Sequence, residues 1–336
     1  MSRRDLLHRV RRALVDADVD DDRTLRRAVL EQLRRSVPFD AFAWLLTDPE
    51  TTVGTSPLAE VPCLDRLPRL VSLRYTTARR WTVDPPGVPH RPVRPGSQLA
   101  RFIAAYGAFD VLSIAFADRF GWWAFLDLWR EGGRFSGQDC ELVGLLADPV
   151  TQALRRSRAA AFGLGDGGRR VAASGQALLL LGPDLTVRRQ TLQAESDLRA
   201  LLPTEESRRP VPAVAYNVAA QLLAVEAGVD VHRAAARTAV APGHWISVQA
   251  TRLDEDIAVT IGPVAQPERW NLFCSAHGLS DRETEIVCHL AEGADTHTLA
   301  ERLHLSEHTV QDHLKSVFAK TAVNSRRELV ARARGV

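Results

Sequence analysis

The stretch SEHTVQDHLKSVFAK (306–320) predicts a helix with two unlike faces. Ser306 is a residue type that caps helix N-termini, and Val310 and Leu314 recur four residues apart on one apolar side. The other side carries His, Gln, Asp and Lys. A polar helix face usually meets only water, so the role of this one depends on the sequence around it.

Three more helical patterns surround this stretch and complete a helix-turn-helix plan. Ser280 followed by Glu283 is the signature of a capping box, Asp295 can cap a second helix, and Ser325 can cap a fourth. Only a short turn separates the second helix from the third. The small Ala300 suits a close crossing of these two helices, which leaves the outer face of the third free to enter a major groove.

This C-terminal part resembles the LuxR-type helix-turn-helix, which is also found in response regulators of the NarL class. The matching positions are Leu279, Ser280, Arg282, Glu283, Glu285, Gly293, Leu299, Ala300, Leu303, Ser306, Thr309, Val310, His313, Lys320, Val323 and Arg326. The resemblance implies a transcriptional regulator that binds double-stranded DNA. Thr296, Thr298 and Asp312 depart from the family pattern. Because a carboxylate repels phosphate but can accept a hydrogen bond from cytosine N4, Asp312 bears on the DNA sequence that is read.

Position on the third helix assigns roles to the polar residues. We expect Gln311, Asp312 and Lys315 at base edges, where Gln suits adenine and Lys suits guanine. Phosphate contacts, which fix register without reading sequence, are expected from Ser306, Thr309, Lys320 and Arg326. For His313, packing, helix capping and a phosphate contact all remain open. The full predicted DNA-binding set is Ser306, Thr309, Val310, Gln311, Asp312, His313, Lys315, Lys320 and Arg326.

Charge in this part is unevenly distributed. The whole chain has a net charge of +2, and residues 271–336 hold eight Lys or Arg against nine Asp or Glu. From Lys315 onward there are six basic residues and one acid, Glu328. A basic half can therefore face the phosphates while an acidic half faces away.

The N-terminal part predicts an antiparallel sheet covered by helices. Helical periodicity occurs at 5–15, 23–36 and 134–162, and strands are expected at 40–48, 111–117 and 122–130. Five prolines make 82–98 an irregular loop. Together with PFDAFAWLLTDPET (38–51) and FSGQDCELVGLLADPVTQALRR (135–156), this order resembles a GAF-type domain over roughly 20–160. We delimit it as residues 1–162.

A second sheet domain is predicted at 176–265. Two strands (176–182 and 186–192), helices at 194–202 and 213–228, and three strands within 237–265 resemble a PAS-like domain. The Gly-rich segment 163–175 is expected to be a linker. It contains G-x-G-x-x-G, but a helix precedes it and a strand follows it, which is the reverse of a dinucleotide site.

A second linker is expected at 266–278, before the helix-turn-helix domain at 279–336. The predicted fold class is therefore α+β, with two antiparallel-sheet domains and an all-α four-helix domain.

These domains suggest how the molecule is regulated. GAF-like and PAS-like domains bind small molecules or dimerise, so we expect a homodimer and possible binding of a small-molecule effector. Trp122, Trp123 and Trp129 are either sheet core or the wall of a ligand pocket. The fourth helix is the expected dimer contact, through Leu329, Val330 and Ala333.

The sequence gives little support to a membrane protein, a secreted protein, a metalloprotein or an enzyme. There is no apolar stretch long enough to cross a membrane and no signal peptide, and the four dispersed cysteines suit a cytoplasmic protein. We expect no metal and no cofactor, since no His or Cys pattern suggests either. Enzymatic activity in the N-terminal domains, coupled to DNA binding, is the alternative function, although no catalytic motif is recognisable.

Overall fold

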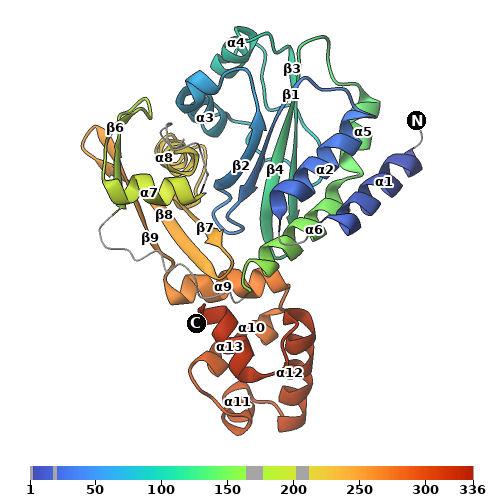
Figure 1. Ribbon diagram of the computed structural model, residues 1–336, viewed down its shortest axis with the longest axis vertical. Coiled ribbons are helices and arrows are strands. Elements are labelled where there is room, and N and C mark those ends of the chain that lie inside the picture. Colours follow the sequence, from blue (N-terminus) through green and yellow to red (C-terminus); the bar gives the residue numbers. More distant parts are fainter. Residues whose placement is uncertain (1–2, 18–20, 164–176, 202–211, 336) are drawn as a thin grey trace.

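The computed structural model describes residues 3–17, 21–163, 177–201 and 212–335, which form two sheet domains and a helical C-terminal domain (Figure 1). The first sheet has the antiparallel order β2-β1-β4-β3 and the second the order β6-β5-β9-β8-β7. The α+β prediction is confirmed. No helix in the described ranges is both long and apolar enough to cross a bilayer.

The first sheet separates two groups of helices. Its strands are β1 (Ala41–Thr47), β2 (Gly54–Glu60), β3 (Asp110–Asp118) and β4 (Gly121–Arg130). One face is covered by α2 (Asp22–Arg34), α5 (Gly137–Gly144) and α6 (Ala147–Ala160), and α1 (Arg3–Asp16) packs on α2 and α6. The other face packs on α3 (Leu67–Tyr75) and α4 (Gln98–Ala104), which follow the short 3-10 helix η1 (Leu64–Arg66).

Alternation along β1 explains this two-sided packing. Phe42 and Trp44 belong to the core with α1, α2 and α6, whereas Ala41 and Ala43 face α3 and α4. Successive strand residues point to opposite faces, so a strand buried on both sides is apolar throughout.

The second domain surrounds one unusually buried helix. Its strands are β5 (Ala177–Leu181), β6 (Val187–Gln190), β7 (Ala235–Ala241), β8 (His244–Leu253) and β9 (Asp256–Pro263), and its helices are α7 (Leu192–Leu201) and α8 (Ala213–Glu226). Every residue of α8 from Ala213 to Gln221 is buried. The helix is apolar on nearly all sides because it packs against its own sheet and also against α3 and β2 of the first domain.

Polar contacts fix α8 to the first domain. Asn217 donates from Nδ2 to the carbonyl oxygen of Gly54 at 2.9 Å, and the Gly54 N–H donates to the Tyr75 hydroxyl at 2.9 Å. A Cβ on Gly54 would lie 2.6 Å from Leu45, so only glycine allows this close approach.

A buried ion pair also joins the two sheet domains. Arg237 of β7 donates to the Asp48 carboxylate from Nε at 2.7 Å and from Nη2 at 2.8 Å. Burial alone would raise the pKa of Asp48, but the hydrogen bonds and charge of Arg237 outweigh it and hold the pKa below its usual value. The same guanidinium donates from Nη1 to the Glu268 carbonyl at 3.2 Å, and so reaches the next helix of the chain.

That next helix corrects a prediction. Residues 266–278, predicted as a linker, form α9 (Gln266–His277), which ends at Gly278 with φ of 65°. It begins with Pro267 at a helix N-terminal position, where proline is well tolerated. Helix α9 packs against α6 on one side and against the C-terminal helices on the other.

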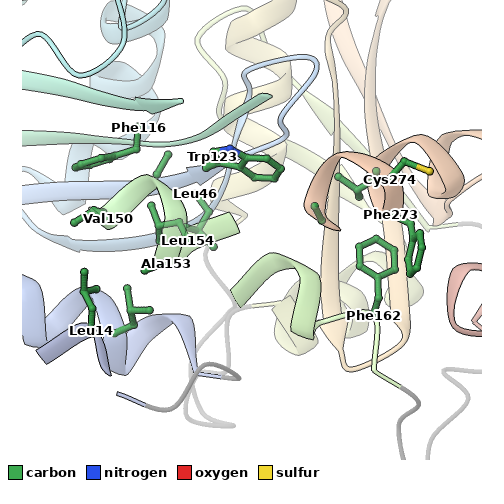
Figure 2. Close-up of a cluster of buried hydrophobic side chains, with 14 of the residues drawn as sticks. Leu14, Leu46, Phe116, Trp123, Val150, Ala153, Leu154, Phe162, Phe273 and Cys274 are labelled. Atoms are coloured by element: carbon green, nitrogen blue, oxygen red, sulfur yellow. The ribbon is translucent and has the colours of Figure 1, made fainter. Parts of the chain in front are cut away.

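Aromatic residues fill the junction at α9 (Figure 2). Phe162, just after α6, stacks on Trp245 with ring centroids 4.5 Å apart and meets Phe273 of α9 edge-on at 5.3 Å. The apolar core therefore runs without interruption from the first domain through α9 into the helix-turn-helix domain.

Other differences from the sequence-based prediction are local. The long helix predicted at 134–162 is two helices, α5 and α6, which break just before Pro149. Strand β2 and helices α3 and α4 have no counterpart in the prediction. The linker predicted at 163–175 lies outside the described residues except for Gly163. The assignment of the sheets to GAF-like and PAS-like domains stays a prediction.

Candidate DNA-binding site

Four capped helices build the C-terminal domain. They are α10 (Asp281–Ala291), α11 (Thr296–Leu303), α12 (Glu307–Thr321) and α13 (Arg326–Arg334). The four predicted caps are all present, because Ser280, Asp295, Ser306 and Ser325 each accept a hydrogen bond from a backbone N–H of the first turn. Such a cap contributes about 1 kcal/mol to helix stability.

The turn between α11 and α12 sets their crossing. His304 adopts a left-handed conformation with φ of 53° and ends α11. Ala300 is 8% exposed at the α11–α12 contact, while Leu299 and Leu314 are buried in the shared core. The helix-turn-helix geometry predicted from the spacing is therefore confirmed.

The outer face of α12 is open to solvent. Gln311, Asp312 and Lys315 are all exposed, as the helical spacing predicts. Lys315 donates from Nζ to Asp312 Oδ1 at 3.1 Å, and this hydrogen bond lowers the pKa of Asp312. Because the pair lies in water, it is weak, and either side chain can exchange its partner for a base edge.

Two members of the predicted set are held by contacts inside the domain, and one of them, Val310, needs correction. Val310 is fully buried in the core of the domain, because its place on the apolar stripe turns it away from the outer face. Lys320 donates from Nζ to Glu283 Oε2 at 2.6 Å, which pairs its charge with α10 while its side chain is 36% exposed, and its phosphate contact stays a prediction.

Glu283 gathers contacts from both ends of the domain. Besides Lys320, its carboxylate accepts hydrogen bonds from the Ser316 hydroxyl at 2.6 Å and the Ser280 backbone N–H at 2.7 Å. Burial alone would raise the pKa of Glu283, but these hydrogen bonds lower it to about 2. The capping-box residue recognised in the sequence thus also ties α12 to α10, a role that only the tertiary structure reveals.

The remaining predicted residues lie around the outer face. Ser306 and Thr309 are joined by a 2.8 Å hydrogen bond between their hydroxyls at the start of α12, and His313 is half-buried. Arg326, at the start of α13, donates from Nη2 to Thr296 Oγ1 at 2.5 Å and is partly exposed. The three roles given to His313 stay predictions.

Two exposed residues near this face were not assigned a role from the sequence. His308 is 84% exposed and lies 3.2 Å from Asp312, a contact that its i,i+4 spacing could have revealed. Arg327 is exposed beside Arg326 and has no bonded partner within the described part of the chain. It is a better candidate for a phosphate contact than Lys320.

The predicted dimer contact on α13 is wrong for this conformation. Leu329 and Ala333 are fully buried, and Val330 is partly buried against the same core. Arg269 of α9 donates from Nε to the Ala333 carbonyl at 2.9 Å and from Nη2 to the Arg332 carbonyl at 3.2 Å. Helix α9 of the same chain therefore covers the surface that the prediction gave to a second copy.

Comparison with known proteins agrees with this geometry. Residues 277–333 match the family described as bacterial regulatory proteins, luxR family. The "Monoamine regulon transcriptional regulator" of Klebsiella aerogenes is 46% identical over 54 residues, which are 16% of this chain and 24% of that protein. The chain thus spans about a quarter of the length of that relative. The C-terminal domain is a LuxR-type helix-turn-helix domain.

Solved structures resemble the whole chain only remotely. SdiA of Escherichia coli is 13% identical, covers 99% of this chain and 96% of its own, and has a TM-score of 0.35. The E. coli DhaR(N)-DhaL complex is 14% identical, covers 79% of this chain and 90% of its own, and has a TM-score of 0.21. Scores this low carry no argument about the N-terminal domains.

Proposed function

We propose that this chain is a sequence-specific, DNA-binding transcriptional regulator of the LuxR type, controlled by its two N-terminal domains. The observation that supports this most directly is the exposed polar face of α12, which rests on a buried core inside the segment that matches the luxR family. Because its proposed partner is chromosomal DNA, we place the protein in the cytoplasm.

The side chains on the proposed interface divide into base contacts and phosphate contacts. Gln311, Asp312 and Lys315 read base edges, and a good contact discriminates by roughly 1–3 kcal/mol. Ser306, Thr309 and the cations at the start of α13 bind phosphates and set the register. The free N–H groups at the start of α12 add a site for one phosphate.

Two copies are proposed to act on paired half-sites. Half-sites about one helical turn apart would be bound together by a homodimer. Because α9 covers the apolar side of α13, the dimer contact must use another surface than the one predicted from the sequence.

We assign the effector of the first domain to a cavity between the sheet and α3 and α4. It has a volume of about 270 Å³ and an almost entirely apolar lining that includes Leu45, Leu70, Ile103 and Trp129. The space exists because small Ala43 and Ala59 lie opposite each other on β1 and β2, where larger residues would fill it.

The charges in its wall indicate what kind of molecule fits. Arg23 lines the cavity, is partly exposed and donates from Nη1 to the Pro57 carbonyl at 3.2 Å. Arg74 and Asp127 also line it and neutralise each other, with Nε 2.7 Å from Oδ2. A neutral, mainly apolar effector therefore suits the cavity better than an ion, because an ion would disrupt this pair. Trp129 serves both roles considered for it, as a buried strand residue and as part of a cavity wall.

The proposed function is tested by selecting bound duplexes from a random pool with the full chain. Enrichment of a defined sequence is expected, with two related half-sites. Recovery of a pool that stays random, at a salt concentration where the protein retains DNA, would contradict sequence-specific binding.

A further inference from the structure

A cavity between the two sheet domains is separate from the effector cavity. It has a volume of about 590 Å³ and lies between α2 and α6 on one side and β7 on the other. Leu46, Trp123 and Leu154, which lie close together at one end of the first-domain core, form part of its apolar wall (Figure 2). Ser56, Ser157 and Thr238 add hydroxyl groups to the lining.

Arg158 in this cavity is a buried cation that forms no direct ion pair with any described residue. It is 7% exposed, and among the described residues its guanidinium donates only from Nη2 to the Thr47 carbonyl at 3.1 Å. The guanidinium also lies 5.4 Å from the ring centroid of Trp245. Buried arginines are ordinarily paired with a carboxylate, because an isolated charge is costly to remove from water.

The neighbouring charges do not satisfy Arg158, because they are already paired with each other. Asp22, which lines the same cavity, forms an ion pair with the fully buried Arg26. Asp48 is held by Arg237 in the bidentate contact that joins the two domains. Glu50 also pairs with Arg237, but its side chain is 61% exposed and faces water. The charges around the cavity therefore balance in number, with Arg26, Arg158 and Arg237 against Asp22, Asp48 and Glu50, but among the described residues Arg158 alone of the three arginines has no carboxylate in direct contact.

A weaker compensation comes from the helix itself. Arg158 lies in the last turn of α6, where backbone carbonyls favour a cation. This effect is modest and leaves most N–H groups of the guanidinium without an acceptor in the described chain. Desolvation lowers the pKa of Arg158, and the nearby charges of Asp22 and Asp48 offset this only in part.

We propose that the cavity between the sheet domains is a second ligand site, which binds a small organic carboxylate through Arg158 while its apolar body packs on Trp123, Leu46 and Leu154. A planar guanidinium matches a carboxylate with two parallel hydrogen bonds. One guanidinium suits a monoanion, since Asp22 in the same wall is already held by Arg26, and the mixed lining suits a molecule with one polar end. The site is independent of the proposed DNA binding, and its ligand differs in charge from the neutral effector of the first cavity.

The test is calorimetric titration of the full chain with hydrocinnamate, benzoate and hexanoate, with hydrocinnamamide as the uncharged match. Saturable binding of at least one carboxylate is expected, together with about tenfold or greater weakening for the amide. Absence of saturable binding for all three acids, or equal affinity for acid and amide, would overturn the proposal.

Variants separate a ligand-binding role of Arg158 from a purely structural one. Arg158→Gln should weaken carboxylate binding about ten- to a hundredfold, since a charge-assisted contact is lost. Arg156→Gln, on the exposed side of the same helix, is the matched control and should bind as the unaltered chain does. If Arg158→Gln fails to fold by circular dichroism, Ala239→Leu serves instead, because a larger side chain there enters the cavity. Unchanged affinity in the folded variant would contradict the assignment.

Discussion

Lys320 Nζ lies 2.6 Å from Glu283 Oε2, so the last basic residue of the proposed recognition helix is bonded to α10. This ion pair crosses the domain from the start of the first C-terminal helix to the end of the third. It fixes the angle at which α12 presents its outer face. The ion pair therefore stabilises the position of the proposed DNA-binding helix, and we do not expect it to contact DNA.

Replacing Glu283 with Gln should loosen α12. The change removes a buried carboxylate with three hydrogen-bond donors, and the expected cost to the stability of the domain is roughly 1–3 kcal/mol. Faster hydrogen exchange of the amides of 309–321 would report it. Glu285→Gln is the control, since the ion pair of Glu285 with Arg282 is exposed, and equal exchange in both variants would contradict the role given to Glu283.

The same carboxylate gives the domain a pH dependence. Its pKa is lowered to about 2 from an ordinary value of 4.5, so its contribution is complete above pH 4.5 and is lost as the pH falls toward 2. Protection of α12 amides should decrease over that window, and the decrease should be smaller in Glu283→Gln. A profile that is flat over this window in the unaltered chain would contradict the ion pair.

Arg326 is predicted to bind phosphate without reading sequence. Arg326→Ala should weaken binding to specific and random duplexes by the same factor and reduce the slope of log affinity against log salt by about one. Fluorescence anisotropy at several salt concentrations measures both. A change confined to the specific duplex would place Arg326 at a base and not at the backbone.

The buried side of α13 gives a prediction about stability. Leu329→Ala should destabilise the C-terminal domain by about 2–5 kcal/mol, because it opens a cavity beside α9 and α10. Limited proteolysis and hydrogen exchange in α13 measure this. Arg327→Ala, on the exposed side of the same helix, is the control. If Leu329→Ala changes only the oligomeric state and leaves hydrogen exchange unaltered, the result would support the dimer contact that was predicted from the sequence.

Filling the effector cavity tests the site in the first domain. Ala43→Leu places three further carbon atoms in the space beside Ala59 and should abolish binding of small neutral apolar molecules. A thermal-shift screen of the full chain provides the ligands, and Ala239→Leu, in the other cavity, is the matched control. If a neutral ligand binds both variants with equal affinity, it does not occupy the effector cavity, and the assignment is contradicted.

The sequence was most informative where local chemistry decides the structure. The caps at Ser280, Asp295, Ser306 and Ser325 and the apolar stripe of α12 follow from short-range rules, and the starts of all four helices were predicted correctly. The exposed positions of Gln311 and Lys315 follow from helical spacing alone.

What the sequence did not predict depends on contacts between distant residues. Strand β2 contains Ser56 and Pro57 and lacks clear alternation, so only its pairing with β1 identifies it. The region of α9 was marked by prolines and a glycine, but these lie at the two ends of a helix that the domains on both sides stabilise. No local sequence pattern predicts the ion pair between Lys320 and Glu283, and none predicts that Arg158 is buried without a direct carboxylate contact in the described chain.

The most direct measurement is duplex selection from a random pool by the full chain and by its Lys315→Ala variant, compared position by position. If the outer face of α12 reads bases, the variant should keep binding and lose preference mainly at one base pair of each half-site, by roughly 1–3 kcal/mol. An unchanged sequence preference in Lys315→Ala, and again in Gln311→Ala, would show that α12 does not read the DNA and would contradict the account.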